Sequence, residues 1–166
     1  PAPCTIGSTR TAATSPSRRS SSAASASRAP PTSDSPAGTG ASVRKLLIPG
    51  HELEGVFYLR DLNDVNRIRG FIGAGKSAVI IGGGYIGLET AASMRKLGMH
   101  VTVLEALPRV LQRVTAPEVS AFYSRVHREE GVNIITDAVV ESLQGNGVVQ
   151  EVKLADGTSL RADVVV

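Results

Sequence analysis

Short apolar runs alternate with helically spaced apolar residues along the middle of the chain. The runs at 77–81, 101–104 and 132–135 are rich in valine and isoleucine, which is typical of strands buried on both faces. Helical spacing of apolar residues over 85–97 and 117–130 fills the two gaps between these runs. The order strand, helix, strand, helix, strand predicts a parallel sheet covered by helices.

Both helices are expected to lie against the sheet. The first helix has Gly98 as its natural stop. Its sheet-facing residues are expected to be Ile86, Ala91, Ala92 and Leu97. The second helix is expected to begin with a capping box in the stretch Thr-Ala-Pro-Glu at 115–118. Its sheet-facing residues are expected to be Val119, Phe122, Tyr123 and Val126.

The flanking segments show two further patterns. Upstream, residues 56–59 predict a strand, and Asp61 is expected to cap a short helix that ends at Gly70. Downstream, the apolar spacing changes from helical to alternating, with turn residues typical of hairpins. We expect a three-stranded antiparallel meander there, followed by another buried strand from residue 163. The alternating segments are 138–143, 148–154 and 158–161.

The first apolar run ends in a glycine cluster that indicates a specific chemistry. The spacing is Gly82-x-Gly84-x-x-Gly87, between the predicted strand and the predicted helix, and Glu105 follows the second strand. Together these features are the fingerprint of a dinucleotide-binding unit, while a glycine-rich structural turn is the alternative. The fold class predicted is α/β: a Rossmann-like, three-layer NAD(P)-binding domain with a parallel sheet and an antiparallel β-meander in place of one crossover helix.

Each fingerprint residue has a physical task. Gly82 permits a tight turn out of the strand, Gly84 lets the backbone approach a pyrophosphate, and Gly87 lets the helix pack closely. The free N–H groups at the helix start favour phosphate. Glu105 is placed to accept hydrogen bonds from an adenosine ribose. Its carboxylate would repel a 2′-phosphate, which favours NADH over NADPH.

Charge and residue usage exclude several other functions. The net charge is +3, and four arginines and one aspartate in residues 1–36 account for it, because the remaining basic and acidic side chains cancel. We therefore expect no nucleic-acid partner. No apolar run approaches the roughly 18 residues of a membrane span, so we expect a cytoplasmic protein without a membrane partner. Cys4 is the only cysteine and the histidines lack ligand spacing, so no metal site is expected.

The first 36 residues have a low-complexity composition, with ten serines and six of the nine prolines. Such a segment buries too little apolar surface to offset the backbone entropy lost on folding, so we expect residues 1–38 to form a disordered tail. Its Arg- and Ser-rich composition is similar to that of a transit peptide, although the chain begins with Pro1 and lacks an amphipathic face. A fragment or a shifted reading frame of GC-rich DNA explains the composition equally well.

The stretch IIGGGYIGLETAASMRKLGMHVTVLEALPRVLQRV resembles the NADH-binding domain of FAD-dependent pyridine-nucleotide oxidoreductases. The resemblance is greatest to the group of ferredoxin, putidaredoxin and rubredoxin reductases, and it extends from Thr39 to Val166. It implies an enzyme with two nucleotide-binding domains and an interface domain. In such enzymes NADH reduces FAD by hydride transfer, and FAD passes electrons to a ferredoxin-type iron–sulfur protein.

The resemblance also implies roles for individual residues. Tyr85 would lie over the nicotinamide, Glu89 near the nicotinamide and flavin, and Arg113 beside the adenosine. The alternatives are that Tyr85 packs on a neighbouring domain, that Glu89 and Arg113 are surface residues, and that Arg109 replaces Arg113. No catalytic residue is assigned. The implied cofactor-binding residues are Gly82, Gly83, Gly84, Tyr85, Ile86, Gly87, Glu89, Glu105 and Arg113.

The FAD-binding glycine motif of that family does not occur in this sequence. We therefore expect residues 39–76 to connect from an FAD domain and residues 77–166 to form the NAD(P)H-binding domain, truncated at its C-terminal end. The predicted function is that of the NADH-binding domain of a flavin-dependent ferredoxin reductase. By itself this domain is expected to bind no FAD and to be inactive. The alternatives are a non-catalytic dinucleotide-binding fragment, or the NADH domain of a reductase similar to apoptosis-inducing factor or monodehydroascorbate reductase.

Overall fold

The computed structural model describes residues 43–166. The expected disorder of residues 1–38 lies outside the described residues and stays a prediction. The helices are α1 (Leu62–Arg69), α2 (Tyr85–Lys96) and α3 (Pro117–Glu129). The strands are β1 (Ser77–Ile81), β2 (His100–Leu104), β3 (Asn133–Ile135), β4 (Val140–Asn146), β5 (Val148–Leu154), β6 (Ser159–Arg161) and β7 (Val164–Val165).

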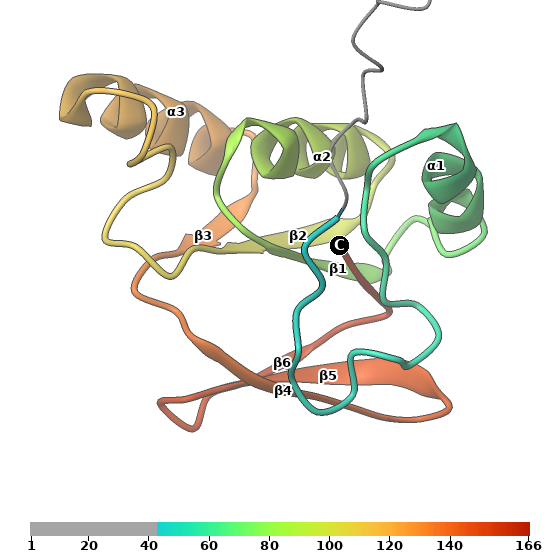
Figure 1. The fold of residues 1–166 in the computed structure, drawn as a ribbon. Helices are drawn as coiled ribbons and strands as arrows, with labels where there is room; N and C mark the ends of the chain where they lie inside the picture. Colours follow the sequence, from blue (N-terminus) through green and yellow to red (C-terminus); the bar gives the residue numbers. More distant parts are fainter. Residues whose placement is uncertain (1–42) are drawn as a thin grey trace, which may run out of the picture. The chain divides into compact units, whose positions relative to one another are not determined.

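The strands form two sheets. The first is parallel, with the order β3-β2-β1-β7, and the second is an antiparallel meander with the order β4-β5-β6. Figure 1 shows the helices on one side of the parallel sheet and the meander on the other. The meander connects β3 to β7, where a crossover helix would otherwise stand. The predicted three-layer fold class is confirmed, with the first meander strand shifted to Val140–Asn146.

Successive residues of β1 belong to different cores. Ala78 and Ile80 pack in a helix-side core with Leu88 of α2, while Val79 packs in a meander-side core with Leu154 of β5. Both faces of the parallel sheet are therefore covered. This explains why its strands appear in the sequence as continuous apolar runs rather than as alternating patterns.

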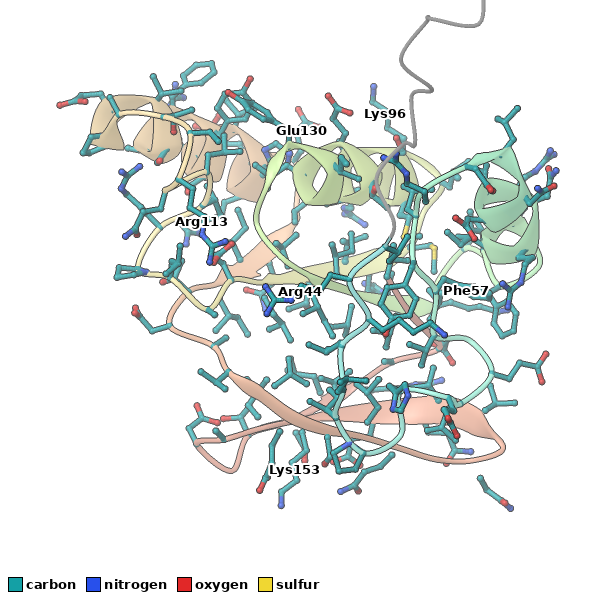
Figure 2. All side chains as sticks on the ribbon, viewed as in Figure 1. Arg44, Phe57, Lys96, Arg113, Glu130 and Lys153 are labelled. Carbon is teal, nitrogen blue, oxygen red and sulfur yellow. The ribbon has the colours of Figure 1, made fainter. Side chains whose placement is uncertain are left out.

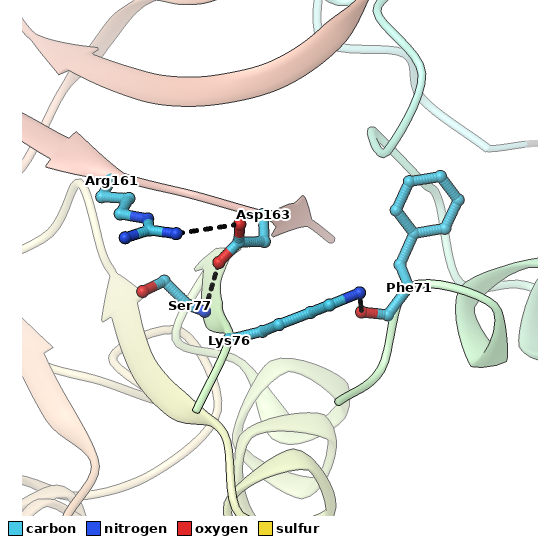
Figure 3. A network of polar contacts seen from close by, with 5 residues as sticks. All are labelled: Phe71, Lys76, Ser77, Arg161 and Asp163. Atoms are coloured by element: carbon cyan, nitrogen blue, oxygen red, sulfur yellow. Dashed lines mark hydrogen bonds and ion pairs between the residues drawn. The ribbon is translucent and has the colours of Figure 1, made fainter. Parts of the chain in front are cut away.

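Asp163 fastens β7 to the start of β1. Its Oδ2 accepts the Ser77 N–H at 2.8 Å, and its own N–H donates to Ser77 O at 2.8 Å. Arg161 lies 3.5 Å from the other carboxylate oxygen, and Lys76 Nζ donates to Phe71 O at 3.2 Å (Figure 3). The Asp163 contacts lie at the N-terminal end of β1. They join β7 to β1 at the opposite end of the strand from the glycine loop, residues 82–87.

The strand predicted at 56–59 is wrong. Val56 forms only an isolated bridge to Val165 of β7, and Phe57 donates its N–H to Val165 O at 2.9 Å. The chain then leaves the sheet edge, because the Phe57 ring is buried in the helix-side core and packs edge-on against Phe71 at 5.1 Å. Pairing with β7 therefore ends at Phe57, where packing against α1 begins.

The predicted sheet-facing side of α2 is wrong at its two ends. Ile86 and Leu97 are 62% and 53% exposed, whereas Leu88, Ala91 and Met94 are buried against the sheet. The helix carries apolar residues on more than one face. The 3.6-residue period therefore does not decide which face meets the sheet.

The stripe predicted for α3 is also wrong in part. Val119 and Phe122 are 40% and 54% exposed, while Ser120 is buried and Tyr123 packs against the helix-side core. The helix lies beside α2 over the β3 edge of the sheet (Figure 1). At an edge only a narrow face of a helix is covered, so much of the apolar stripe stays outside.

The two predicted caps have different outcomes. Asp61 caps α1 as predicted: its side chain accepts the Asp64 N–H at 3.0 Å, and the Asp64 side chain accepts the Asp61 N–H at 3.1 Å. The capping box predicted for α3 is wrong, because the N-cap is Ala116, which has no side-chain cap. Thr115 instead donates its hydroxyl to Leu111 O at 3.1 Å.

None of the helices found in residues 43–166 combines the length and apolar character that spanning a bilayer requires.

Candidate functional site

The fingerprint glycines form the turn between β1 and α2. Gly82 has a φ of +118°, a conformation that residues with a Cβ rarely adopt. A Cβ on Gly87 would collide with the carbonyl oxygen of Gly82, so this position holds the helix close to the strand end. A Cβ on Gly84 would meet nothing within 4 Å, which leaves open space beside the backbone. The three geometries match the three tasks expected of these glycines.

The start of α2 offers free hydrogen-bond donors to this open space. Gly84 is the N-cap, and the Leu88 N–H donates to Gly84 O at 3.0 Å. The N–H groups of Tyr85, Ile86 and Gly87 have no acceptor among residues 43–166. Free N–H groups at a helix N-terminus, together with the helix dipole, favour a phosphate group. The start of α2 therefore fits the pyrophosphate of a dinucleotide.

A partly open cavity of about 690 Å³ adjoins the glycine loop. This volume lies in the range of small-molecule sites. Arg44 lines the cavity from the segment before β1 (Figure 2), and nothing in its local sequence marks it as a site residue. The lining also includes Tyr58, Gly82, Gly84, Tyr85, Ile86, Gly87, Thr90 and Val165.

Glu105 stands directly after β2 and faces the glycine loop. Its Oε2 accepts the Gly83 N–H at 2.8 Å, and its Oε1 accepts the Leu107 N–H at 2.9 Å. A carboxylate oxygen can accept two hydrogen bonds, so each oxygen retains capacity for a ribose hydroxyl. The structure thus brings Glu105 and Gly83 together at the position where an adenosine ribose is expected.

The two arginines of the following loop differ in their surroundings. Arg109 donates to Thr115 O at 2.9 Å, to Ser120 Oγ at 2.6 Å and to Gln112 O at 3.1 Å. It therefore holds the loop against the start of α3. Arg113 is exposed on the same loop (Figure 2) and makes no hydrogen bond within the described part of the chain. The geometry favours Arg113 over Arg109 as the arginine available to a ligand, and its contact with adenosine stays a prediction.

The residues predicted at the nicotinamide end are only partly brought together. Tyr85 lines the cavity, is 46% exposed and packs edge-on against Tyr123 at 6.2 Å. Ile86 lines both this cavity and a neighbouring groove of about 300 Å³ between α1 and α2. Glu89 is exposed and lines the groove without lining the cavity. The role expected of Glu89 beside the nicotinamide stays a prediction.

The histidines have structural roles where the structure describes their contacts. His127 links two helices, with Nε2 3.2 Å from Leu88 O and Nδ1 2.9 Å from Tyr123 O. His51 Nδ1 lies 2.9 Å from Ile48 O. Residues 43–166 contain no group of three or more His, Cys, Asp or Glu side chains that could hold a metal ion.

Comparisons with known proteins agree with this geometry. Residues 37–166 match the family described as pyridine nucleotide-disulphide oxidoreductase. Putidaredoxin reductase of Pseudomonas putida is 51% identical over 112 residues, which are 66% of this chain and 26% of that protein. The ferredoxin reductase subunit of the 5,5′-dehydrodivanillate O-demethylase of Sphingobium sp. is 41% identical over 129 residues, which are 76% of this chain and 31% of that protein.

A solved structure supports the same relationship. The crystal structure of the covalent putidaredoxin reductase–putidaredoxin complex is similar with a TM-score of 0.71 at 45% identity, over 74% of this chain and 31% of that chain. The chain thus spans between 26% and 31% of the length of these relatives. Because the family match covers most of the chain, including the glycine loop and Glu105, the chain belongs to the pyridine nucleotide-disulphide oxidoreductase family.

Proposed function

We propose that this chain binds NADH as the pyridine-nucleotide part of a flavin-dependent reductase. The observation that carries the proposal is the arrangement at the C-terminal edge of β1 and β2. Free N–H groups at the start of α2 stand beside the open space at Gly84, and the Glu105 carboxylate stands beside Gly83. The pyrophosphate binds at the helix start and the adenosine ribose at Glu105. The nicotinamide then lies in the cavity lined by Tyr85 and Ile86.

The complete protein is proposed to pass electrons to a ferredoxin-type iron–sulfur protein in the cytoplasm. The names of the similar reductases, which refer to putidaredoxin and ferredoxin, support this partner class. NADH supplies a hydride and FAD accepts it, so the cofactors carry the reaction. The described residues bind and orient the dinucleotide, and none of them needs to act as an acid or base.

NADH is proposed to bind more tightly than NADPH. Glu105 would face the 2′-phosphate of NADPH, and like charges at short range oppose binding. Arg113 lies on the same loop and weakens this preference without removing it.

Calorimetric titration of the purified 166-residue chain with NADH and NADPH tests the proposal. Loss of charge-assisted hydrogen bonds predicts that Glu105→Ala weakens NADH binding about tenfold or more. Glu130→Ala is the matched control, because Glu130 is exposed at the far end of α3 (Figure 2). An unmodified chain that binds no NADH would contradict the proposal, and equal affinity for NADPH would contradict the role of Glu105.

The chain alone is proposed to bind no FAD. The described residues contain one glycine-rich turn from strand to helix, which serves one dinucleotide. An absorption spectrum of the purified chain should therefore lack flavin bands. NADH-dependent reduction of an artificial electron acceptor by this chain alone would favour an autonomous enzyme over a dinucleotide-binding part.

A further inference from the structure

The loop between β2 and α3 is fastened to the glycine loop at one residue, Gly83. The Gly83 N–H donates to Glu105 Oε2 at 2.8 Å, and Gly83 O accepts the Leu111 N–H at 2.9 Å. Both polar groups of the Gly83 backbone are thus bound by the loop that carries the adenosine-side residues. The dinucleotide fingerprint assigns tasks to Gly82, Gly84 and Gly87 and none to this position.

Packing reinforces the same attachment. A Cβ on Gly83 would lie 2.9 Å from Val110 Cγ1 and 3.1 Å from both Cβ and Oε2 of Glu105. Val110 is fully buried at 0% exposure. The β2–α3 loop is therefore pressed onto the glycine loop where any larger residue would push it away.

Leu111 forms the corner of this loop in an unusual conformation. Its φ is +55°, in the left-handed region that leucine normally avoids, and its side chain is only 2% exposed. This backbone directs the Leu111 N–H to Gly83 and its carbonyl to the N–H groups of Val114 and Thr115, both at 3.0 Å. The corner therefore determines the course of the residues that follow it, which include Arg113.

We propose that Leu111 is a positioning residue for the adenosine half of the bound dinucleotide. Its left-handed corner holds the β2–α3 loop against Gly83, and this keeps the Glu105 carboxylate and Arg113 on the ligand side of the loop. Leu111 acts through these neighbours and not by contact with the ligand. The inference rests on the proposed NADH function and adds a residue that controls the position of the adenosine.

Two substitutions separate backbone conformation from packing. Leu111→Val keeps a buried apolar side chain, but a β-branched residue strongly disfavours positive φ. Leu111→Gly accepts positive φ freely but removes the buried side chain, so it lowers thermal stability more. AMP is the ligand to titrate, because it carries the adenosine half without the nicotinamide.

The proposal predicts that AMP affinity falls about tenfold in Leu111→Val and stays within about threefold of the original in Leu111→Gly. Leu154→Ala, in the meander-side core, is the control and should lower stability while AMP affinity is unchanged. Gly83→Ala is the second variant should Leu111→Val fail to fold, and its Cβ should weaken AMP binding by displacing the same loop. The proposal would be overturned if AMP affinity followed thermal stability, so that Leu111→Gly bound AMP more weakly than Leu111→Val. It would also be overturned if Leu111→Val and Gly83→Ala both bound AMP as tightly as the unmodified chain.

The outcome for the unmodified chain separates this inference from the proposed function. An unmodified chain that binds neither NADH nor AMP overturns the proposed function and the inference with it. If the unmodified chain binds both NADH and AMP, and the AMP affinity of the variants follows their stability, only the inference about Leu111 is overturned.

Discussion

Gly84 and Gly87 stand three residues apart in one fingerprint but limit different properties of the protein. A Cβ on Gly87 would collide with backbone, so Gly87→Ala forces α2 away from the strand end and should lower the free energy of unfolding by about 2 kcal/mol. Gly84→Ala meets open space. Alanine is a poorer N-cap than glycine, which lowers stability, but it also lowers the entropy of the unfolded chain, which raises stability. The two effects oppose each other, so the free energy of unfolding should change by less than about 1 kcal/mol.

NADH binding should respond in the opposite order. In the proposed NADH complex, the Cβ of Gly84→Ala would stand where the pyrophosphate approaches the helix start, so this variant should lose affinity although it remains folded. Urea denaturation and NADH titration of both variants test this separation. Undiminished NADH affinity in Gly84→Ala would show that the pyrophosphate does not approach the backbone at Gly84.

Asp156 provides a pH-dependent prediction in the turn between β5 and β6. The Thr158 N–H donates to Asp156 Oδ1 at 2.8 Å, and this hydrogen bond holds the pKa of Asp156 below its ordinary value of 3.8. A pKa lowered by folding means that the stabilisation is present above the unfolded-state value. It is lost as the pH falls through the lower folded-state value.

An NMR titration of the Asp156 carboxyl group in the folded protein should show a midpoint below that of the same group in the urea-unfolded chain. Equal midpoints would mean that the hydrogen bond from Thr158 is not maintained in solution.

Residue types predict a site well where one residue has a local backbone task. Gly82 and Gly87 were predicted correctly because the tight turn at Gly82 and the close helix packing at Gly87 are both requirements of the local backbone. Gly83 was named only as a cofactor-binding residue, and its hydrogen bonds with the β2–α3 loop were not predicted. The left-handed corner at Leu111 and the place of Arg44 in the cavity lining were not predicted either, since each depends on a contact with a distant segment. No sequence signal marks Leu111, because leucine is not a residue type associated with a left-handed corner.

At the scale of elements, the two N-caps lead to a prediction of opposite signs. Asp61→Ala removes two hydrogen bonds at the start of α1 and should cost about 1 kcal/mol of stability. Ala116 has extended backbone angles suited to an N-cap but supplies no side-chain acceptor to α3. Ala116→Ser should therefore stabilise the protein by about 0.5–1 kcal/mol.

Thermal denaturation monitored by circular dichroism measures both changes. Thr115→Ser, next to the cap and with its hydroxyl retained, is the control for Ala116→Ser. A destabilised Ala116→Ser would show that the start of α3 is held mainly by Arg109 and not limited by its missing cap.

Elements were predicted more reliably than their orientation. Local patterns placed α2 and α3 near their observed bounds, because a helix depends mainly on spacing and on stop residues such as Gly98 and Gly131. The inward face of each helix depends on which other element lies beside it. That information is tertiary, and this is why Ile86 and Phe122 were assigned to the wrong side.

At the scale of the whole described chain, the order of elements was sufficient to predict the layers. Parallel β-strands require crossover connections. The alternating apolar spacing after β3 indicated that one of these connections consists of β-strands in place of a helix. The neighbours of β1 were not predictable from local pattern. β7 pairs with β1 although the two strands are far apart in the sequence, and Asp163 adds hydrogen bonds from its backbone and its side chain to Ser77.

The contribution of β1 to both cores predicts that the layers of residues 43–166 unfold together. Ile80 packs on the helix side and Val79 on the meander side of the same strand, so neither core can open without disturbing β1. Leu154→Ala, which leaves a cavity on the meander side, should lower the free energy of unfolding by about 2–5 kcal/mol. Native-state hydrogen exchange should show this decrease equally for the slowest amides of α2 and of β5, because both open only in the global transition. Loss of protection confined to the meander would show instead that β4, β5 and β6 open as a separate unit while the parallel sheet and its helices stay folded.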